Sequence, residues 1–370
     1  MQDNDPTPPS GVEPSNYNAP EQDAPLTSDV IFQPSPSSEN TGSTLRVDMP
    51  FADFEQAAQA VDRIRQQIGR VLIGQPQVVE QVIIALLASG HVLIEGVPGL
   101  GKTLLVKALA RCFDGQFGRI QFTPDLMPSD VTGHALYDMK TERFTIRRGP
   151  AFTNLLLADE INRAPAKTQA ALLEIMQEKQ ITIEGKGFAA LTPFMVLATQ
   201  NPIEQEGTYP LPEAELDRFM LKIRIDYPDL QEEIKLVTQV TTGQRLDGLN
   251  VDAIEPVITS EQVQRIQALV SNIVADPAVV EYAVRLVRQT RQWPSFSFGA
   301  GPRASIALLR AGRAQALLRH RNFVLPDDIK RVALPVLRHR ITLNAELELE
   351  GVSPDQALES MIAEVDAPRL

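Results

Sequence analysis

The chain has 370 residues, 43% of them hydrophobic, and it carries a formal net charge of −12 with a sequence pI near 5.0. This length predicts two domains, and the acidic balance argues against a dedicated nucleic-acid binder, which is usually basic. The single cysteine, Cys112, excludes an internal disulfide framework and favours a reducing compartment. No apolar run approaches the length of a membrane span and no secretory signal is visible, so we expect a soluble cytoplasmic protein.

Residues 1–46 are rich in Pro, Ser, Asn, Asp and Gln and poor in apolar residues, which predicts a disordered tail. Such a tail is either a solvated extension or a recognition segment. Order begins near Phe51. The apolar residues within 53–70 recur at three- and four-residue steps, which predicts an amphipathic helix. A second helix is expected from about Pro76 to Ser89. Between the two helices, Ile73 and Gly74 either help to form an apolar adenine pocket or simply pack between the helices.

Residues 96–103 read GVPGLGKT and fit the phosphate-binding pattern G-x-x-x-x-G-K-[ST]. An apolar run at 91–95 precedes them as an expected buried strand, and residues 104–111 follow as the start of a helix. The glycines let backbone N–H groups turn towards a phosphate, and the helix N-terminus adds unpaired donors. We expect Lys102 to reach the β- and γ-phosphates and the Thr103 hydroxyl to bind Mg²⁺. The expected nucleotide-binding residues are Ile73, Gly74, Gly96, Val97, Pro98, Gly99, Leu100, Gly101, Lys102, Thr103 and Leu104.

Two adjacent carboxylates end a later apolar run. A second strand is expected at 119–123, and residues 136–138 and 143–146 flank a polar turn and predict a hairpin. The run at 154–158 reads as a buried parallel strand that ends in Asp159 and Glu160, and ligands bind at that end of such sheets. We expect Asp159 to bind Mg²⁺, directly or through water, and Glu160 to orient and polarise the attacking water.

Another buried strand, expected at 194–199, ends in a polar amide. A helix at 165–179 and a second hairpin, with strands at 181–184 and 188–191, precede it. The strand leads into Asn201, whose amide can hydrogen-bond a γ-phosphate or the attacking water. The alternative is an Asx turn that Asn201 makes with the following proline.

Residues 221–225 alternate apolar and basic side chains and predict the last strand of the sheet. From Pro228 onward no strand-like run is comparably strong, and helices are expected at 229–240, 260–273, 277–292, 302–319 and 326–338. Three of them begin with proline, which suits a first helical turn. Arg303 lies in the first turn of its helix, where a cation opposes the helix dipole. It therefore either serves an anionic partner or is an ordinary solvated arginine.

Taken together, these motifs resemble those of the MoxR family of AAA+ ATPases, from about Phe51 to about Leu337. They are IGQ at residues 73–75, HVLIEGVPGLGKT, LLADEINRAPAKTQAALLEIMQE, ATQNPIEQEGTYPLPEAELDRF and the helix-opening GPRAS. The third and fourth are the most specific for this family. The N-terminal tail lies outside the resemblance.

The resemblance implies an α/β fold: a P-loop AAA+ αβα sandwich whose five parallel strands are ordered 5-1-4-3-2. It places this core with its two hairpin inserts at 47–226 and an all-α lid domain at 227–370. Residues 96–103 would be Walker A, Asp159 and Glu160 Walker B, and Asn201 sensor 1. Arg218 resembles an arginine finger presented to a neighbouring subunit, and Arg303 resembles sensor 2, reaching the nucleotide from the lid. The implied catalytic residues are Lys102, Glu160, Asn201, Arg218 and Arg303.

The resemblance also implies what the protein binds. ATP or ADP with Mg²⁺ would occupy the site, and copies of the chain would close into a ring of six subunits. MoxR-like proteins resemble chaperones that mature or activate client proteins, often with a von Willebrand A-domain partner. No key position departs from the family pattern, so we expect an active hydrolase.

Three other functions are compatible with parts of the sequence. A nucleic-acid motor would use the hairpins, but their tips carry only scattered charge in an acidic chain. A magnesium-chelatase motor subunit is a close cousin, although the EQEGTYPLPEAELDRF block favours MoxR. A nucleotide-regulated scaffold without useful turnover would not need the complete catalytic set.

Overall fold

The computed structural model describes residues 51–96, 100–140, 143–201, 208–241, 251 and 254–369. Residues 46–370 belong to one compact unit. The tail predicted at 1–46 lies outside the described residues, as do Val97, Pro98 and Gly99 of the predicted phosphate loop. The division into a core at 47–226 and a lid at 227–370 remains a prediction. Within the described residues, no helix is both long enough and apolar enough to cross a membrane.

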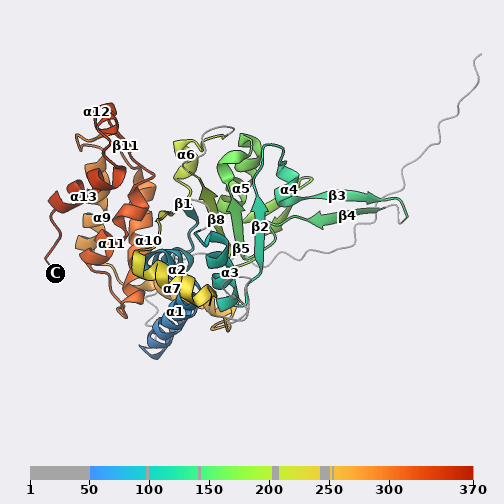
Figure 1. The fold of residues 1–370 in the computed structure, drawn as a ribbon, viewed down its shortest axis with the longest axis horizontal. Coiled ribbons are helices and arrows are strands. Elements are labelled where there is room, and N and C mark those ends of the chain that lie inside the picture. The colour runs from blue at the N-terminus through green and yellow to red at the C-terminus, as the bar shows by residue number, and fades with distance from the viewer. Residues whose placement is uncertain are drawn as a thin grey trace, which may run out of the picture. The chain divides into compact units, whose positions relative to one another are not determined.

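Five parallel strands form the central sheet (Figure 1). They are β1 (Val92–Gly96), β2 (Phe117–Gln121), β5 (Leu155–Asp159), β8 (Met195–Gln200) and β9 (Leu221–Ile225). Their order is β2-β5-β8-β1-β9, and every neighbouring pair is parallel. Counted along the chain, the sheet order is 2-3-4-1-5. Read from the other edge, this is the predicted order 5-1-4-3-2, which is therefore confirmed.

The side chains of the central strands alternate between two separate cores. In β1, Val92 and Ile94 belong to one core, whereas Leu93 belongs to the other. Because successive side chains of a strand point to opposite faces, the sheet is buried on both sides. The first core also contains residues of α1 (Phe51–Val71), α2 (Pro76–Leu87) and α3 (Lys102–Cys112). The second contains residues of α5 (Ala166–Glu178). The molecule is thus a three-layer sandwich.

Helix α2 connects the sheet to the helical C-terminal part of the chain. It is apolar on almost all sides and contacts α1, α8, α10 and β9. The first core therefore continues without a break into the C-terminal helices. These are α7 (Leu230–Thr241), α8 (Ser260–Asn272), α9 (Pro277–Thr290), α10 (Pro302–Leu318) and α11 (Pro326–Leu337), close to the predicted ranges, followed by α12 (Ala345–Leu349) and α13 (Pro354–Glu364).

Both predicted hairpins are present. Strands β3 (Gly133–Asp138) and β4 (Arg143–Arg148) follow the short helix α4 (Pro128–Thr132) and form an antiparallel ribbon that extends away from the sheet (Figure 1). Strands β6 (Gln180–Ile183) and β7 (Lys186–Ala189) form the second hairpin. Its turn is tighter than predicted, because Glu184 and Gly185 take φ values of 46° and 73°, as a two-residue hairpin turn requires.

Sequence patterns did not reveal the shortest elements. A small antiparallel pair, β10 (Phe296–Phe298) with β11 (Thr342–Leu343), joins segments on either side of α10 and α11. The one-turn helices α6 (Glu213–Leu216) and η1 (Ile161–Arg163) were also not predicted. Elements this short hold too few residues to show a period of 2.0 or 3.6.

His91 lies at the amino end of β1 and joins it to the neighbouring strand β8 and to helix α5. Its Nε2–H donates to the carbonyl of Met176 (3.1 Å) and its Nδ1 accepts from the N–H of Val196 (3.0 Å). The ring must be neutral to make both bonds. Burial lowers the pKa of His91 from 6.5 to about 4, although the bond to Met176 acts in the opposite direction.

We expect His91 to destabilise the fold in mild acid. Because folding lowers the pKa of His91, its contribution is full above pH 6.5 and is lost as the pH falls towards 4. The loss between pH 7 and pH 5 should be about 2 kcal/mol. Urea unfolding at both pH values checks this: His91→Gln should flatten the pH dependence by that amount, although it lowers stability at pH 7. His134→Gln, on the β3–β4 ribbon, is the control. An unchanged slope in His91→Gln would contradict the assignment.

Candidate functional site

A pocket lies where the central strands end at their carboxyl termini, the edge at which parallel sheets bind ligands. Its lining residues come from the start of α3 and from the ends of β2, β5 and β8. They are Gly101, Lys102, Thr103, Leu104, Arg119, Gln121, Asp159, Glu160, Thr199 and Asn201. The structure therefore brings together seven residues predicted from separate motifs: Gly101, Lys102, Thr103, Leu104, Asp159, Glu160 and Asn201.

The start of α3 is shaped by two glycines. Gly101 takes a left-handed conformation (φ 76°), and a Cβ there would lie 3.0 Å from the Cδ1 of Leu72. Gly96 ends β1 so close to β9 that a Cβ would lie 2.6 Å from the carbonyl oxygen of Ile225. These constraints let the chain turn sharply between strand and helix. The first N–H groups of α3 then face the pocket without helical partners.

Lys102 is the cation at the start of α3, and Arg119 is a second cation in the same pocket. Its ammonium group donates to the carbonyl oxygen of Gly96. Burial lowers the pKa of Lys102, whereas the carboxylates of Asp159, Glu160 and Glu95 raise it. A cation that carboxylates surround and that the α3 N-terminus adjoins is suited to bind an anionic phosphate.

Asp159 is held in one orientation by two neighbours. Thr199, on the adjacent strand β8, donates its hydroxyl to Oδ1 of Asp159 (2.6 Å) and accepts the backbone N–H of Glu160 (2.9 Å). Arg119, on β2, donates to Oδ2 of Asp159 (2.8 Å). One threonine therefore fixes both the carboxylate and the backbone that follows it.

Glu160 has a strained backbone and a restrained carboxylate. Its φ and ψ of 56° and 50° are left-handed, which costs a non-glycine residue on the order of 1 kcal/mol and is typical of functional sites. Its Oε2 accepts from Gln121 (2.6 Å) and from Arg163 (3.0 Å). The carboxylate is therefore held at the pocket by side chains from two different elements.

Sequence reasoning missed Arg119, Gln121 and Thr199. Arg119 and Gln121 are two residues apart in β2, so both side chains point to the same face beside β5. The sequence shows these two polar side chains at alternate positions of the strand. It does not show which residues at the end of β5 they bond. Thr199 stands two residues before Asn201 and is buried. The available signal in the sequence was a hydroxyl residue at the end of a predicted buried strand, close to a predicted site residue.

Gly74 lines a separate pocket, at the carboxyl end of β9. Ile73 is not among its lining residues, which are mostly polar or charged: Gly74, Gln75, Pro76, Gln77, Val78, Gln81, Arg224, Asp226, Tyr227, Glu232, Arg338 and Asp355. A Cβ on Gly74 would lie 3.0 Å from atoms of both Pro228 and Glu232. The structure thus shows Gly74 packed against the start of α7, and the adenine role of Ile73 and Gly74 remains a prediction.

Arg303 does not join Lys102. It lines a third pocket together with Arg218, Arg310, Arg340 and Lys179, where the acids are Glu178 and Asp217. This pocket also includes Ser89, Gly90 and His91, the residues before β1, so it lies at the amino edge of the sheet. A parallel strand rises about 3.3 Å per residue, which puts the two ends of β1 about 16 Å apart. Arg303 therefore lies apart from Lys102 in this structure, and its predicted role at a nucleotide remains a prediction.

Three comparisons with known proteins agree with this fold and site. Family models match residues 91–221 (ATPase family associated with various cellular activities, AAA) and residues 288–361 (AAA lid domain). The chain is 46% identical over 303 residues to YeaC of Bacillus subtilis, covering 82% of this chain and 93% of that protein. It is 41% identical over 319 residues to Chaperone MoxR1 of Mycobacterium tuberculosis, covering 84% and 83%. A crystal structure of a candidate ATPase from Cytophaga hutchinsonii superposes with a TM-score of 0.79 at 40% identity, covering 86% of this chain and 98% of that one.

The chain is an AAA+ ATPase. The strand order of its sheet, the carboxylate pair at the sheet edge and the helical lid are those of this class. Within that class, the identities to its named relatives place the chain in the MoxR family of AAA+ ATPases. The family predicted from the sequence motifs is thus confirmed.

Thr199 offers a test of the pocket. Thr199→Val keeps the side-chain volume but removes both hydrogen bonds, leaving the buried N–H of Glu160 unpaired, so stability should fall by about 1–3 kcal/mol. Nucleotide should then require more Mg²⁺ to bind, since Asp159 keeps only the bond from Arg119 and is less firmly oriented. Titration of a fluorescent ATP analogue with Mg²⁺ measures this. Thr199→Ser should recover most of the affinity, and an Mg²⁺ dependence in Thr199→Val equal to that of the wild type would contradict the role.

Proposed function

We propose that this protein hydrolyses ATP at the interfaces of a closed ring of identical subunits and uses the energy to remodel or activate partner proteins. One observation carries the proposal. Lys102, Asp159, Glu160 and Asn201 line a pocket at the carboxyl edge of the sheet, whereas Arg218 and Arg303 line a pocket at the amino edge. Each chain would thus supply a nucleotide pocket to one site and two arginines to another. A complete site would form only where two chains meet.

The half at the carboxyl edge would bind Mg²⁺ and ATP. Within the described residues no group of three or more His, Cys, Asp or Glu side chains could hold a metal alone. Mg²⁺ suits such a site, because it takes one or two protein oxygens and completes its shell with phosphates and water. Thr103 and Asp159 are the residues that would hold it, and it would neutralise phosphate charge when bound. Lys102 would contact the β- and γ-phosphates.

Glu160 and Asn201 would position the attacking water. Glu160 presents a carboxylate that accepts from Gln121 and Arg163, so it is available to accept a proton or a hydrogen bond from water. Asn201 is buried at the end of β8 and lines the same pocket. An amide there can hydrogen-bond the γ-phosphate and hold the water in line with it.

The half at the amino edge would act on the neighbouring subunit. Arg218 would stabilise the charge that develops on the γ-phosphate, an effect worth roughly 10³–10⁵ in rate for arginine fingers. Arg303 is 60% exposed and lines the same pocket, so it would reach the neighbour's nucleotide and not its own. A head-to-tail contact of this kind forms a ring when its rotation closes. The family resemblance suggests six subunits.

The exposed ribbon β3–β4 supports a remodelling role. Tyr137 and Phe144 stand opposite each other on one face with their rings 5.2 Å apart, and Phe144 is 73% exposed. Beyond them, Met139 at the tip is 86% exposed. Exposed apolar groups of this kind commonly contact other proteins. Client proteins, including a von Willebrand A-domain partner, are the partners we propose.

The family assignment favours this function over a magnesium-chelatase motor. A nucleic-acid motor has one feature in its favour: β4 carries the exposed cations Arg143, Arg147 and Arg148. A motor of that type would bind DNA with an affinity that falls steeply as salt increases. We expect no such binding, which filter retention at 50 and 200 mM salt would check.

Activity should depend on assembly. We expect the ATPase rate per subunit to rise with protein concentration as the ring forms, which coupled-enzyme assays combined with mass measurements in ATP and ADP would show. Glu160→Gln should bind ATP but lose turnover, and Arg218→Ala should lose turnover by about 10³-fold or more. A concentration-independent rate in a monomer, with Arg218→Ala unaffected, would sink the shared-site proposal and leave a self-contained hydrolase.

A further inference from the structure

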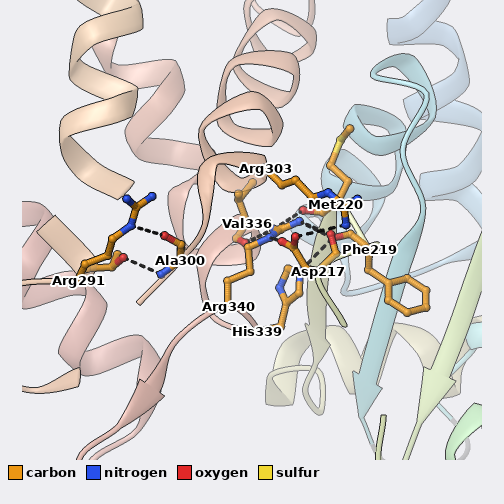
Figure 2. A network of polar contacts seen from close by, with 10 residues as sticks. Asp217, Phe219, Met220, Arg291, Ala300, Arg303, Val336, His339 and Arg340 are labelled. Carbon is orange, nitrogen blue, oxygen red and sulfur yellow. Dashed lines mark hydrogen bonds and ion pairs between the residues drawn. The ribbon is translucent and has the colours of Figure 1, made fainter. Parts of the chain in front are cut away.

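Arg340 is a buried cation in the segment between α11 and β11. Only 4% of its side chain is exposed, and it lies between the C-terminal helices and the segment that leads into β9 (Figure 2). A buried charge is costly unless it is paired and fully hydrogen-bonded. The contacts of Arg340 therefore indicate why the fold keeps it.

All five N–H groups of the Arg340 guanidinium have an acceptor. Nε donates to Oδ1 of Asp217 (2.7 Å). Nη1 donates to the carbonyls of Met220 (3.1 Å) and Val336. Nη2 donates to the carbonyls of Phe219 (2.7 Å) and Asp217 (3.3 Å). Four of these five bonds go to the short segment 217–220, and the fifth goes to Val336 in the preceding helix α11.

Those four bonds surround Arg218. The carbonyl of Asp217 precedes it, and the carbonyl of Phe219 follows it. The neighbouring His339 also donates to the Phe219 carbonyl through Nε2 (3.0 Å), so this oxygen has two donors from one segment (Figure 2). The backbone on both sides of Arg218 is therefore fixed to residues 339 and 340.

The side chain of Arg218 makes only weak polar contacts with the other described residues. Its Nη1 donates to the carbonyl of Leu173 at 3.3 Å, a long bond. Its Nε is buried, and among the described residues it has no acceptor. The direction of the guanidinium thus depends on the backbone that carries it, and Arg340 holds that backbone.

Asp217 extends the same network to Arg303. Its Oδ1 accepts from Arg340, and its Oδ2 lies 3.7 Å from Nη1 of Arg303 (Figure 2). One carboxylate therefore faces both a buried arginine and an exposed one. The exposed arginine lines the same pocket as Arg218.

We propose that Arg340 is a positioning residue for Arg218: it fixes the backbone of residues 217–220 so that Arg218 meets the nucleotide of the neighbouring subunit. This inference rests on the proposed role of Arg218 at the subunit interface. Arg340 lines the same pocket as Arg218, but all five of its N–H groups already have acceptors, so it would act through the segment it holds. A lysine cannot replace it, because an ammonium group has three donors and no planar fork to reach these acceptors together.

Arg340→Lys should therefore slow turnover without weakening nucleotide binding. A misplacement of about 1 Å costs about 10²-fold in rate, so kcat should fall between about 10- and 10²-fold. The affinity for an ATP analogue in its own pocket should stay within about twofold, since that pocket lies at the other edge of the sheet. Arg321→Lys is the matched control: Arg321 is a partly buried arginine that pairs with Asp328 (2.6 Å) and touches no residue of 217–220. It should keep the wild-type kcat.

Mixed rings separate a role at the interface from a merely structural one. Arg340→Lys has an intact pocket but a misplaced Arg218, whereas Glu160→Gln has a dead pocket but an intact Arg218. In an equimolar mixture, about one quarter of the interfaces combine the two intact halves. The mixture should then hydrolyse ATP faster than the sum of the separate variants. A mixture of Arg218→Ala with Glu160→Gln provides the reference.

The outcomes distinguish the two proposals. A gain in both mixtures supports the positioning role. A gain with Arg218→Ala but none with Arg340→Lys overturns it and leaves the shared site intact, as does a wild-type kcat in Arg340→Lys. No gain in either mixture overturns the shared site and this inference together. Should Arg340→Lys fail to fold, Asp217→Asn removes the charge pair, keeps the backbone acceptors and undergoes the same mixing test.

Discussion

All five strands of the sheet run in the same direction, and this polarity determines where each functional group lies. The carboxyl ends present the start of α3, the carboxylates that follow β5 and the amide that follows β8. The amino ends face Arg218 and Arg303. Because a five-residue strand is about 16 Å long, no side chain spans from one edge to the other. The groups of the proposed site therefore lie at opposite edges of the sheet in one chain, which is why the proposal needs a second subunit.

Buried polar groups connect the layers of this sandwich. His91 joins the amino end of β1 to α5 and β8, and Arg340 joins the C-terminal helices to the segment before β9. Each is deeply buried, and each has its important polar atoms satisfied by backbone carbonyls or N–H groups. Such groups add little net stability, because the cost of desolvation offsets the hydrogen bonds gained. Removing one partner leaves the other unpaired, which costs about 3–5 kcal/mol of stability for a buried charge. They specify one arrangement of the layers.

The sequence was sufficient to predict the sheet order, both hairpins and the pocket residues from Lys102 to Asn201. The hairpins and the pocket residues follow from local motifs and from apolar runs with a clear period, whereas the strand order was implied by the resemblance to the MoxR family. Contacts between distant segments were not predictable in this way. Arg340 and Asp217 are 123 residues apart, and Gln121 and Glu160 are 39 apart. Arg303 was placed by resemblance at its own chain's nucleotide, whereas the packing of α10 puts it at the opposite edge.

Residues 338–340 touch both edges of the sheet. Arg340 holds the segment around Arg218, while Arg338 pairs with Asp355 (3.1 Å), which also pairs with Arg224 (3.3 Å). Arg224 lies 3.4 Å from Glu95, and burial would raise the pKa of Glu95, but Lys222 and Arg224 outweigh it and lower that pKa. Glu95 directly precedes Gly96, where the phosphate loop begins. The segment 338–340 is thus linked to the start of the phosphate loop through Asp355, Arg224 and Glu95, and it contacts the backbone around Arg218 directly.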